Sequence, residues 1–479
     1  MVFTSLNFLI FFPIVTVLYF ITPKKYRWIT LLVSSYFFYI NVKPVYVLLV
    51  SSITLSTYFF ARLIDNTNIE SKKKSYMVVN IVLILVPLFF FKYFSVINNG
   101  ILTLLETHNL RWPLPEIKFI LPIGISFYTF MAIGYTIDVY NEEIKSEKNI
   151  GILALFVSFF PVILSGPIER AKNMLPQFNA PRNFDYSMVV QGIKLMLWGY
   201  FMKLVLADRV GIYIDAVFNN IEQHSGITLL LATLLNPIRV YGDLGGYSLI
   251  AIGCANIMGI NVIPNFNRPF FAISMSEFWR RWHMSLITWL TDYIYTPLSF
   301  SLRKLRIWGI VIALMLTFFI SGVWHGAALT FVIWGIFQGV LLSIEALINY
   351  YKKIFGIKNN LNLKWWFILI GCVCTYLLFA FSLLIGGALD SISQAFYAFK
   401  KIFTDTPHLP YKDGVTMLYS FIAFCILFMK DFRDEFYPTG FHLFENKRLV
   451  IRWLSYYILI FIILFFGVFS GEQFIYYRF

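Results

Sequence analysis

Charged residues are scarce in this chain of 479 amino acids, at 13% of the total. Soluble domains carry about a quarter charged residues and are about half apolar. Here the hydrophobic share is 59%, the mean hydropathy is +0.71, and no polar stretch is long enough for a separate soluble domain. We therefore expect an all-α polytopic membrane protein in which residues 1–479 form one membrane domain.

Cysteine is scarce as well, with four residues in the chain. Cys254, Cys372, Cys374 and Cys425 all lie in apolar sequence. Cys372 and Cys374 have neither the spacing of zinc ligands nor a pair of histidines nearby. We interpret all four as packing residues and expect no disulfide framework.

Motifs for metal and cofactor chemistry are missing too. The sequence contains no H-E-x-x-H or carboxylate cluster, no Walker loop, no GxSxG turn and no dinucleotide-binding glycine pattern. We therefore expect no metal site and no bound cofactor, and we expect no nucleic acid among the partners. The chemistry that remains is histidine acting as a general base in a pocket enclosed by the membrane.

The charge that is present is mostly positive, with 39 lysines and arginines, 25 aspartates and glutamates, and a net charge of +14. Positive-inside topology explains most of this excess. A cationic cytoplasmic face also suits anionic lipid of the bilayer, or an acidic cytoplasmic partner.

Apolar stretches recur along the whole chain and add up to about eleven crossings, with re-entrant or interfacial helices among them. Residues 98–118 are a polar excursion, and residues 241–248 interrupt an apolar stretch with a glycine-rich turn. Residues 265–282 are basic, amphipathic and rich in tryptophan, which is typical of an interfacial or re-entrant helix.

The central apolar run covers residues 307–344 and is too long for one crossing. Gly322 and Gly326 are natural places for it to bend. A helix over residues 307–320 rises only ~21 Å, so a break at Ser321 would leave His325 below the membrane surface. An ionisable side chain at that depth is a functional candidate, and burial favours the neutral imidazole that accepts a proton. The alternative is a structural histidine bonded to a neighbouring carbonyl group.

Polar residues elsewhere leave two interpretations open. Arg280, Arg281 and His283 suit the cytoplasmic mouth of a pocket, where the phosphates of an acyl donor need cations. A snorkelling interfacial helix explains the two arginines equally simply, and pattern alone favours it. Asp243 is either a site carboxylate or a helix-breaking cap in its glycine turn. Glu169 can be part of a site or of an interfacial ion pair with the adjacent arginine.

Four distinctive segments follow one another along the chain: GISFYTF at residues 124–130, SGPIER at 165–170, FWRRWH at 278–283 and WHG at 324–326. In this order they resemble the motifs of the bacterial membrane-bound O-acyltransferases. The likeness covers nearly the whole chain. It is strongest to the branch of alginate O-acetyltransferase membrane subunits, with the D-alanyl transferases of teichoic acid modification as near relatives.

This resemblance implies a ring of helices around a thin central region, with a funnel through which acyl groups cross. It implies that His325, in the WHG motif, is catalytic and that His283 is also part of the active centre. The substrate-binding candidates are Trp324, Arg280, Arg281, Asp243, Tyr128 and Glu169. One departure is Leu249, where alginate-type members usually carry an aspartate. This departure puts alginate itself in doubt as the substrate.

From these motifs we expect an O-acyltransferase of the cytoplasmic (inner) membrane that moves an acyl group, most readily acetyl. The donor is a cytoplasmic thioester of coenzyme A or of an acyl carrier protein, and the acceptor is an extracytoplasmic polysaccharide. Transfer is direct or passes through a periplasmic or extracellular SGNH-type acyltransferase. The alternatives are D-alanyl transfer to a cell-wall polymer and, in a different class, secondary transport. Transporters usually contain inverted repeats, and the sequence has no detectable repeat.

Four of the last six residues, FIYYRF at 474–479, are aromatic. Composition alone favours an interfacial aromatic belt with Arg478 as its anchor. The segment also resembles an aromatic C-terminal motif of this family and its small membrane partners, in which a tyrosine can accept the acyl group. An adjacent base can activate a phenol, so Tyr476 and Tyr477 are candidates for an acyl relay.

Overall fold

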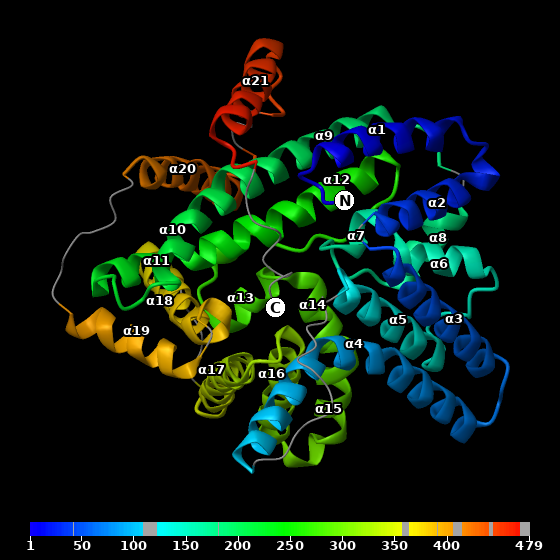
Figure 1. Cartoon of the computed structure of the whole chain (residues 1–479), viewed down its shortest axis with the longest axis horizontal. Coiled ribbons are helices and arrows are strands. Elements are labelled where there is room, and N and C mark those ends of the chain that lie inside the picture. The colour runs from blue at the N-terminus through cyan, green and yellow to red at the C-terminus, as the bar shows by residue number, and fades with distance from the viewer. Residues whose placement is uncertain are drawn as a thin grey trace. The chain divides into compact units, whose positions relative to one another are not determined.

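The computed structural model describes most of the chain, namely residues 1–41, 43–108, 122–180, 182–356, 364–389, 391–405, 414–439 and 444–469. Within these ranges the chain is helical and has no strand (Figure 1). Nine of the described helices are long and apolar enough to cross a membrane, and two shorter apolar helices cover Leu6–Ile21 and Ile150–Ile163. The expectation of an all-α polytopic membrane protein is therefore confirmed. The ring and funnel stay predictions.

The nine candidate spans are distributed from the first quarter of the chain to its end. Two of them join α-helices through a π-helical turn (η2 or η3), and a third ends in the π-helical turn η7. They are α3 (Val45–Asp65), α4 (Glu70–Thr107), α9–η2–α10 (Tyr186–Phe218), α11–η3–α12 (Gly226–Ile257), α16 (Ile307–His325), α17 (Leu329–Ile354), α18–η7 (Trp365–Ala388), α20 (Gly414–Phe436) and α21 (Leu449–Phe466).

The chain divides into two compact units, of which the first comprises Met1–Leu195 and Ile250–Ile263. In this unit α5 (Ile125–Tyr140) packs against α3 and α4, and nearly all of its residues are buried. Gly124 begins α5 with a φ of 78°, a left-handed conformation that glycine adopts readily. A Cβ atom there would lie 2.1 Å from the carbonyl oxygen of Ile163, so the position also requires glycine for space.

The second unit comprises Met196–Leu249 and Pro264–Phe479. Its core is aromatic: Phe278 and Phe379 have ring centroids 4.3 Å apart, and Trp282 lies 4.9 Å from the same Phe379 ring. Phe278 and Trp282 come from the short α13 segment (Met275–Arg281) and its C-cap, and Phe379 from α18. Burying these large rings fixes α13 against a membrane span. The prediction of one membrane domain over residues 1–479 stays a prediction.

The central apolar run forms a helical hairpin, α16 and α17, but the predicted break at Ser321 is wrong. The helix continues to His325 and ends where Gly326 adopts an extended conformation. Gly322 stays helical because it is needed for packing: a Cβ atom there would lie 2.5 Å from the carbonyl oxygen of Phe331 on α17. The 19 residues of α16 rise ~28 Å. The depth of His325 in the membrane was inferred from a shorter helix, so that inference does not apply.

Two other boundaries differ from the expectation. The predicted polar excursion begins later, because α4 continues helically through residues 98–107. The predicted glycine turn at residues 241–248 is a π-helical turn, η3 (Tyr241–Gly245), inside a continuous helix. A π-turn keeps the backbone hydrogen-bonded while admitting an extra residue, which an apolar pattern with interspersed glycines does not reveal.

Candidate active site

His283 lies at the junction of α13 and α14 (Met284–Leu290), where its φ of 46° and ψ of 49° turn the chain between the two helices. This left-handed conformation is uncommon outside glycine, although histidine adopts it more often than most residues. The side chain is 1% exposed, and its Nδ1 lies 3.0 Å from Oδ1 of Asn265. Burial lowers the pKa of His283 to about 3, so the imidazole is neutral at physiological pH.

Asn265 belongs to an extended segment that runs beside the α13–α14 junction. Its backbone carbonyl accepts a hydrogen bond from the amide of Met284 at 2.8 Å, and the amide of Asn267 donates to the carbonyl of Arg281 at 2.9 Å. Asn265 also donates from Nδ2 to Oγ of Ser248 at 2.9 Å. The turn that carries His283 is therefore held by backbone and side-chain bonds to one neighbouring segment.

His325, the last residue of α16, is surrounded by aromatic rings. Its ring centroid lies 4.7 Å from that of Trp324, 5.1 Å from that of Trp334 and 6.4 Å from that of Phe331. The Trp334 ring stands nearly perpendicular to the imidazole, at 87°. His325 is half-buried, so the aromatic rings confine it without closing it off.

Trp324 connects the two histidines. Its ring centroid lies 6.5 Å from that of His283 and 4.7 Å from that of His325. The sequence places His283 and Trp324 41 positions apart, and the fold brings them into contact. Three of the predicted site residues therefore form one centre in the second unit.

A chain of hydrogen bonds supports the aromatic wall beside His325. Nε1 of Trp334 lies 3.3 Å from Oγ of Ser382, and Nε2 of Gln338 donates to the same oxygen at 2.8 Å. Nε1 of Trp279 donates in turn to Oε1 of Gln338 at 3.3 Å. These bonds tie α17 to α18 and α13 and fix the orientation of the Trp334 ring. Gln338 and Ser382 were not predicted as part of the site, because each lies in an uninterrupted apolar span.

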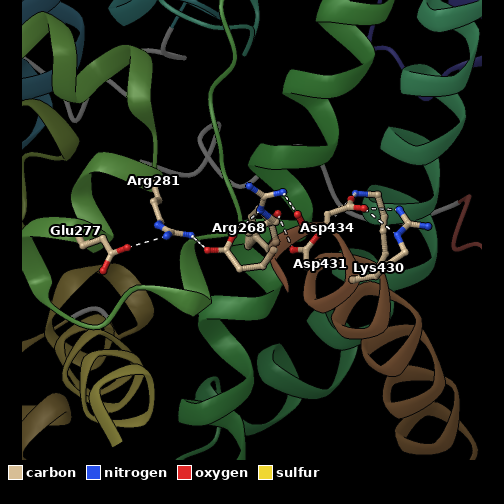
Figure 2. A network of polar contacts seen from close by, with 9 residues as sticks. Arg268, Glu277, Arg281, Lys430, Asp431 and Asp434 are labelled. Atoms are coloured by element: carbon tan, nitrogen blue, oxygen red, sulfur yellow. Dashed lines mark hydrogen bonds and ion pairs between the residues drawn. The ribbon is translucent and has the colours of Figure 1, made fainter. Parts of the chain in front are cut away.

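The two arginines of the FWRRWH segment have different surroundings. Arg280 is exposed. Arg281 forms ion pairs with Glu277 at 2.7 Å and with Glu435 at 2.9 Å. Figure 2 shows Arg281 between carboxylates, and Arg268 also pairs with Glu435, at 2.8 Å. Charge alone makes both arginines candidates for a phosphate, but Arg281 is already neutralised inside the protein.

The same network extends along α20 (Figure 2). Lys430 pairs with Asp434 at 2.9 Å and lies 3.7 Å from Asp431. Asp431 accepts a hydrogen bond from the hydroxyl of Tyr241 on η3 at 3.1 Å. Arg268 donates to the backbone carbonyl of Asp434 at 2.7 Å, so the loop that follows Asn265 is also fastened to α20.

Asp243 lies on η3 and is buried with a lysine. Its Oδ1 is 2.7 Å from Nζ of Lys203 on η2 (Phe201–Ala207), and Lys203 also pairs with Asp208 at 2.7 Å. The lysine ammonium lies 5.4 Å from the centre of the Tyr247 ring. The structure thus rules out the helix-breaking cap for Asp243, because the residue is inside a continuous helix and paired with a buried cation.

Tyr128 and Glu169 lie in the first unit. Tyr128 is buried in α5, with its ring edge-on to Tyr39 at 6.4 Å. Glu169 is 1% exposed and accepts hydrogen bonds from Nδ2 of Asn173 at 2.8 Å and from the amide of Ile263 at 2.6 Å. Burial raises the pKa of Glu169. The carboxylate therefore holds the segment at Ile263 in place, whether or not it also meets a substrate.

Two further sequence predictions, the acyl relay and the absence of a metal site, stay predictions. Tyr476 and Tyr477, the candidates for an acyl relay, lie outside the described residues. Among the residues that are described, no group of three or more histidine, cysteine, aspartate or glutamate side chains could hold a metal ion.

Comparison with known proteins shows the family to which the chain is similar. Residues 139–384 match the sequence profile of MBOAT, the membrane-bound O-acyltransferase family. The chain is 33% identical to the probable alginate O-acetylase AlgI of Pseudomonas aeruginosa over 347 residues, which are 72% of this chain and 66% of that protein. It is 32% identical to the peptidoglycan O-acetyltransferase of Helicobacter pylori over 365 residues, 70% of this chain and 67% of that protein.

A third relative carries a different acyl group in its name. The teichoic acid D-alanyltransferase of Streptococcus thermophilus is 30% identical over 262 residues, 51% of this chain and 63% of that protein. The matches therefore span about two thirds of the length of these three relatives.

The fold and the site together define a polytopic, all-α membrane protein with a histidine pair around one tryptophan. The chain belongs to the membrane-bound O-acyltransferase family. Its enzyme class is acyl transfer, as the four sequence motifs predicted.

Proposed function

We propose that this protein transfers an acyl group, most readily acetyl, from a cytoplasmic thioester to a hydroxyl of an extracytoplasmic polysaccharide. The observation that carries this proposal is the contact of His283 and His325 with the single indole of Trp324. Two relatives are named for O-acetylation of alginate and of peptidoglycan, which supports acetyl as the group and a polymer as the acceptor.

The chemistry requires a base and a thiol leaving group. His325, half-buried among aromatic rings, accepts the proton of the attacking hydroxyl group while its oxygen bonds to the thioester carbonyl carbon. The carbon–sulfur bond then breaks, and the histidine returns the proton to the departing thiolate. The products are an ester and a free thiol, so atoms and charge balance without a metal or redox cofactor.

The donor needs a cationic contact for its phosphates, whether it is acetyl-CoA or an acyl carrier protein. Arg280 is the exposed cation next to the histidine turn and is the proposed contact. Arg281 supports it by fastening α13 through Glu277 and Glu435. Asp243, Tyr128 and Glu169 remain proposed substrate-binding residues, each with a structural partner described above.

The proposed setting is the cytoplasmic membrane, with the polymer outside and the thioester inside. A periplasmic or extracellular SGNH-type acyltransferase is the proposed partner where transfer is not direct. D-alanyl transfer is the second candidate, because the D-alanyltransferase of Streptococcus thermophilus matches 51% of this chain at 30% identity.

Inside-out membrane vesicles distinguish these donors. Vesicles with and without the protein are given labelled acetyl-CoA, acetyl carrier protein or D-alanyl carrier protein, and label that becomes ester-linked to polymer in the lumen is counted. We expect acetyl label from one thioester to depend on the protein. If only D-alanyl carrier protein gives label on the polymer, the transferred group is D-alanyl and not acetyl. If no thioester gives label, the proposed function is rejected.

A further inference from the structure

One atom of the Asn265 side chain, Oδ1, lies within hydrogen-bond distance of three potential donors. Oδ1 lies 3.3 Å from the backbone nitrogen of Ser285, 2.8 Å from Oγ of Ser285 and 3.0 Å from Nδ1 of His283. Asn265 is itself 1% exposed, so its amide has no bulk solvent in which to reorient. The arrangement joins the histidine ring to the first turn of α14.

The backbone amide of Ser285 identifies the atom that faces it. An amide N–H only donates, so the Asn265 atom in contact with it must be the carbonyl oxygen. The other end of the same side chain is compatible with this orientation, because the NH₂ group faces Oγ of Ser248, an oxygen that can accept. A flipped side chain would set an NH₂ group against an N–H group.

An amide oxygen accepts hydrogen bonds and cannot donate one. The contact at 3.0 Å therefore requires Nδ1 of His283 to carry the proton. In a neutral imidazole the other nitrogen, Nε2, is then unprotonated and presents its lone pair. Burial of the ring favours this neutral state.

We infer that Asn265 is a positioning residue that fixes His283 as the Nδ1–H tautomer, so that Nε2 acts as a hydrogen-bond or proton acceptor and never as a donor. The role of this tautomer in catalysis rests on the proposed function. The tautomer excludes the neutral His283 ring from stabilising an oxyanion, which would need an N–H at that nitrogen. The substrate group that meets His283 must carry a hydrogen, as a hydroxyl of the acceptor or an amide of the pantetheine arm does.

The frame around Asn265 is suited to such a task because it does not depend on His283 alone. The backbone carbonyl of Asn265 accepts from Met284, and the amide of Asn267 donates to the carbonyl of Arg281. Asn265 thus stays in place when the histidine ring is altered. Among the described contacts of the ring, those with Asn265, Phe266 and Trp324 are with side chains that do not titrate.

Ring ¹⁵N resonances of histidine-labelled protein in lipid bilayers test the tautomer directly. The His283 signals are assigned by their loss in His283→Gln, and the spectrum needs no substrate. We expect the wild-type protein to give a protonated Nδ1 and an unprotonated Nε2. If the spectrum shows the Nε2–H tautomer, the inference is wrong even when the protein proves to be an acyltransferase. If it shows the Nδ1–H tautomer but the protein transfers no acyl group, only the proposed function is rejected.

Two substitutions of Asn265 provide the functional arm. Asn265→Asp keeps an acceptor oxygen and adds a negative charge, so it should keep the tautomer, raise the pKa of His283 and move the acid limb of the kcat–pH profile to higher pH. Asn265→Leu removes the acceptor and should lower kcat about 10–100-fold, the range seen when a partner that orients a functional histidine is lost. Ser248→Ala is the matched control, because Ser248 contacts the amide nitrogen of Asn265 and not the oxygen that faces His283, and it should keep the wild-type ring resonances.

The kinetic parameters locate the substrate group. A raised KM for the thioester in Asn265→Leu indicates the pantetheine amide, and a raised KM for the acceptor indicates the hydroxyl. If Asn265→Leu retains both the wild-type tautomer and the wild-type kcat, Asn265 has no positioning role. An unmoved pH profile in a folded Asn265→Asp protein would contradict the inference as well.

Discussion

The two histidines share one indole but are held in different ways. His283 is 1% exposed and hydrogen-bonded to Asn265, whereas His325 is half-buried and confined by the rings of Trp324 and Trp334. The hydrogen bond to Asn265 sets the tautomer of the buried His283 ring, whereas the His325 ring is only partly buried among its aromatic neighbours. This difference fits one histidine that accepts a hydrogen bond and another that exchanges a proton.

We expect substitutions of the adjacent Arg280 and Arg281 to have different effects. Arg280→Ala removes an exposed cation and should raise the KM for the thioester with little effect on folding. Arg281→Ala leaves Glu277 and Glu435 without a shared partner and should lower thermal stability, because a network loses its central cation. Thioester-dependent label uptake by vesicles and melting curves in detergent measure the two effects. Equal donor dependence in Arg280→Ala and wild type would remove Arg280 from the donor site.

The buried lysine predicts an order of stabilities. Lys203 pairs with both Asp208 and Asp243 at 2.7 Å, so Lys203→Met leaves two carboxylates side by side in the interior. Removing one partner of a buried pair costs about 3–5 kcal/mol. Asp243→Asn leaves a balanced pair of one lysine and one aspartate, so it should cost much less. Melting temperatures of the two variants check this, and an Asp243→Asn protein as unstable as Lys203→Met would contradict the pairing.

At the scale of elements, the α16–α17 hairpin depends on a close backbone contact. Gly322→Ala would put a Cβ atom 2.5 Å from the carbonyl oxygen of Phe331, and backbone cannot move aside as a flexible side chain can. We expect a loss of about 1–3 kcal/mol, typical of overpacking, and a fall in acyl transfer because His325 is one turn away. Gly100→Ala is the control, since a Cβ atom there has nothing within 4 Å. Equal melting temperatures for both variants would show that the helices have room to separate.

Sequence reasoning located much of this element but not its geometry. It singled out His325 and His283, because a histidine beside glycines and one after a tryptophan–arginine cluster stand out in apolar sequence, and it added Trp324 through the resemblance to the family's WHG motif. It put the helix break at Ser321, because a glycine needed for helix packing and a glycine needed for a bend look alike. It could not pair Asn265 with His283, since that contact depends on which segments fold against each other.

Charge pairs were equally hidden from the sequence. Lys203 lies 40 positions before Asp243, and Glu435 lies 154 positions after Arg281. Glu435 lies among other charges, and Arg281 directly follows Arg280, so the sequence indicates that buried charges must be paired but not with which partner. The π-helical turns that bring Lys203 and Asp243 together cannot be read from a helical periodicity.

At the scale of the whole molecule, family membership and a set of nine described crossing-length helices identify a polytopic acyltransferase. The proposed reaction needs an acyl group to move from one side of the membrane to the other. The C-terminal hexapeptide, residues 474–479, is the predicted relay for that movement, and it lies outside the described residues.

The relay has a direct test. Replacing Tyr476 and Tyr477 together by phenylalanine removes both phenolic nucleophiles and keeps the aromatic anchor. We expect this variant to insert normally in the membrane and to lose polymer acylation. Normal acylation by the double phenylalanine variant would leave the hexapeptide as an anchor only.

The central claim is that His325 carries acyl transfer within a histidine pair. The measurement that tests it most directly is the number of ester-linked acetyl groups on surface polysaccharide purified from cells that express wild type, His325→Ala or His224→Ala at equal levels. His224 is the matched control. Its contact among the described residues is a hydrogen bond at 3.2 Å with the backbone carbonyl of Ala216, near the end of α10 (Asp208–Phe218). We expect the acetyl count in the His224→Ala strain to match wild type. We expect few or no acetyl groups in the His325→Ala strain, because loss of a general base lowers the rate by about 10²–10⁴-fold. Near-normal acetylation with His325→Ala would contradict the account.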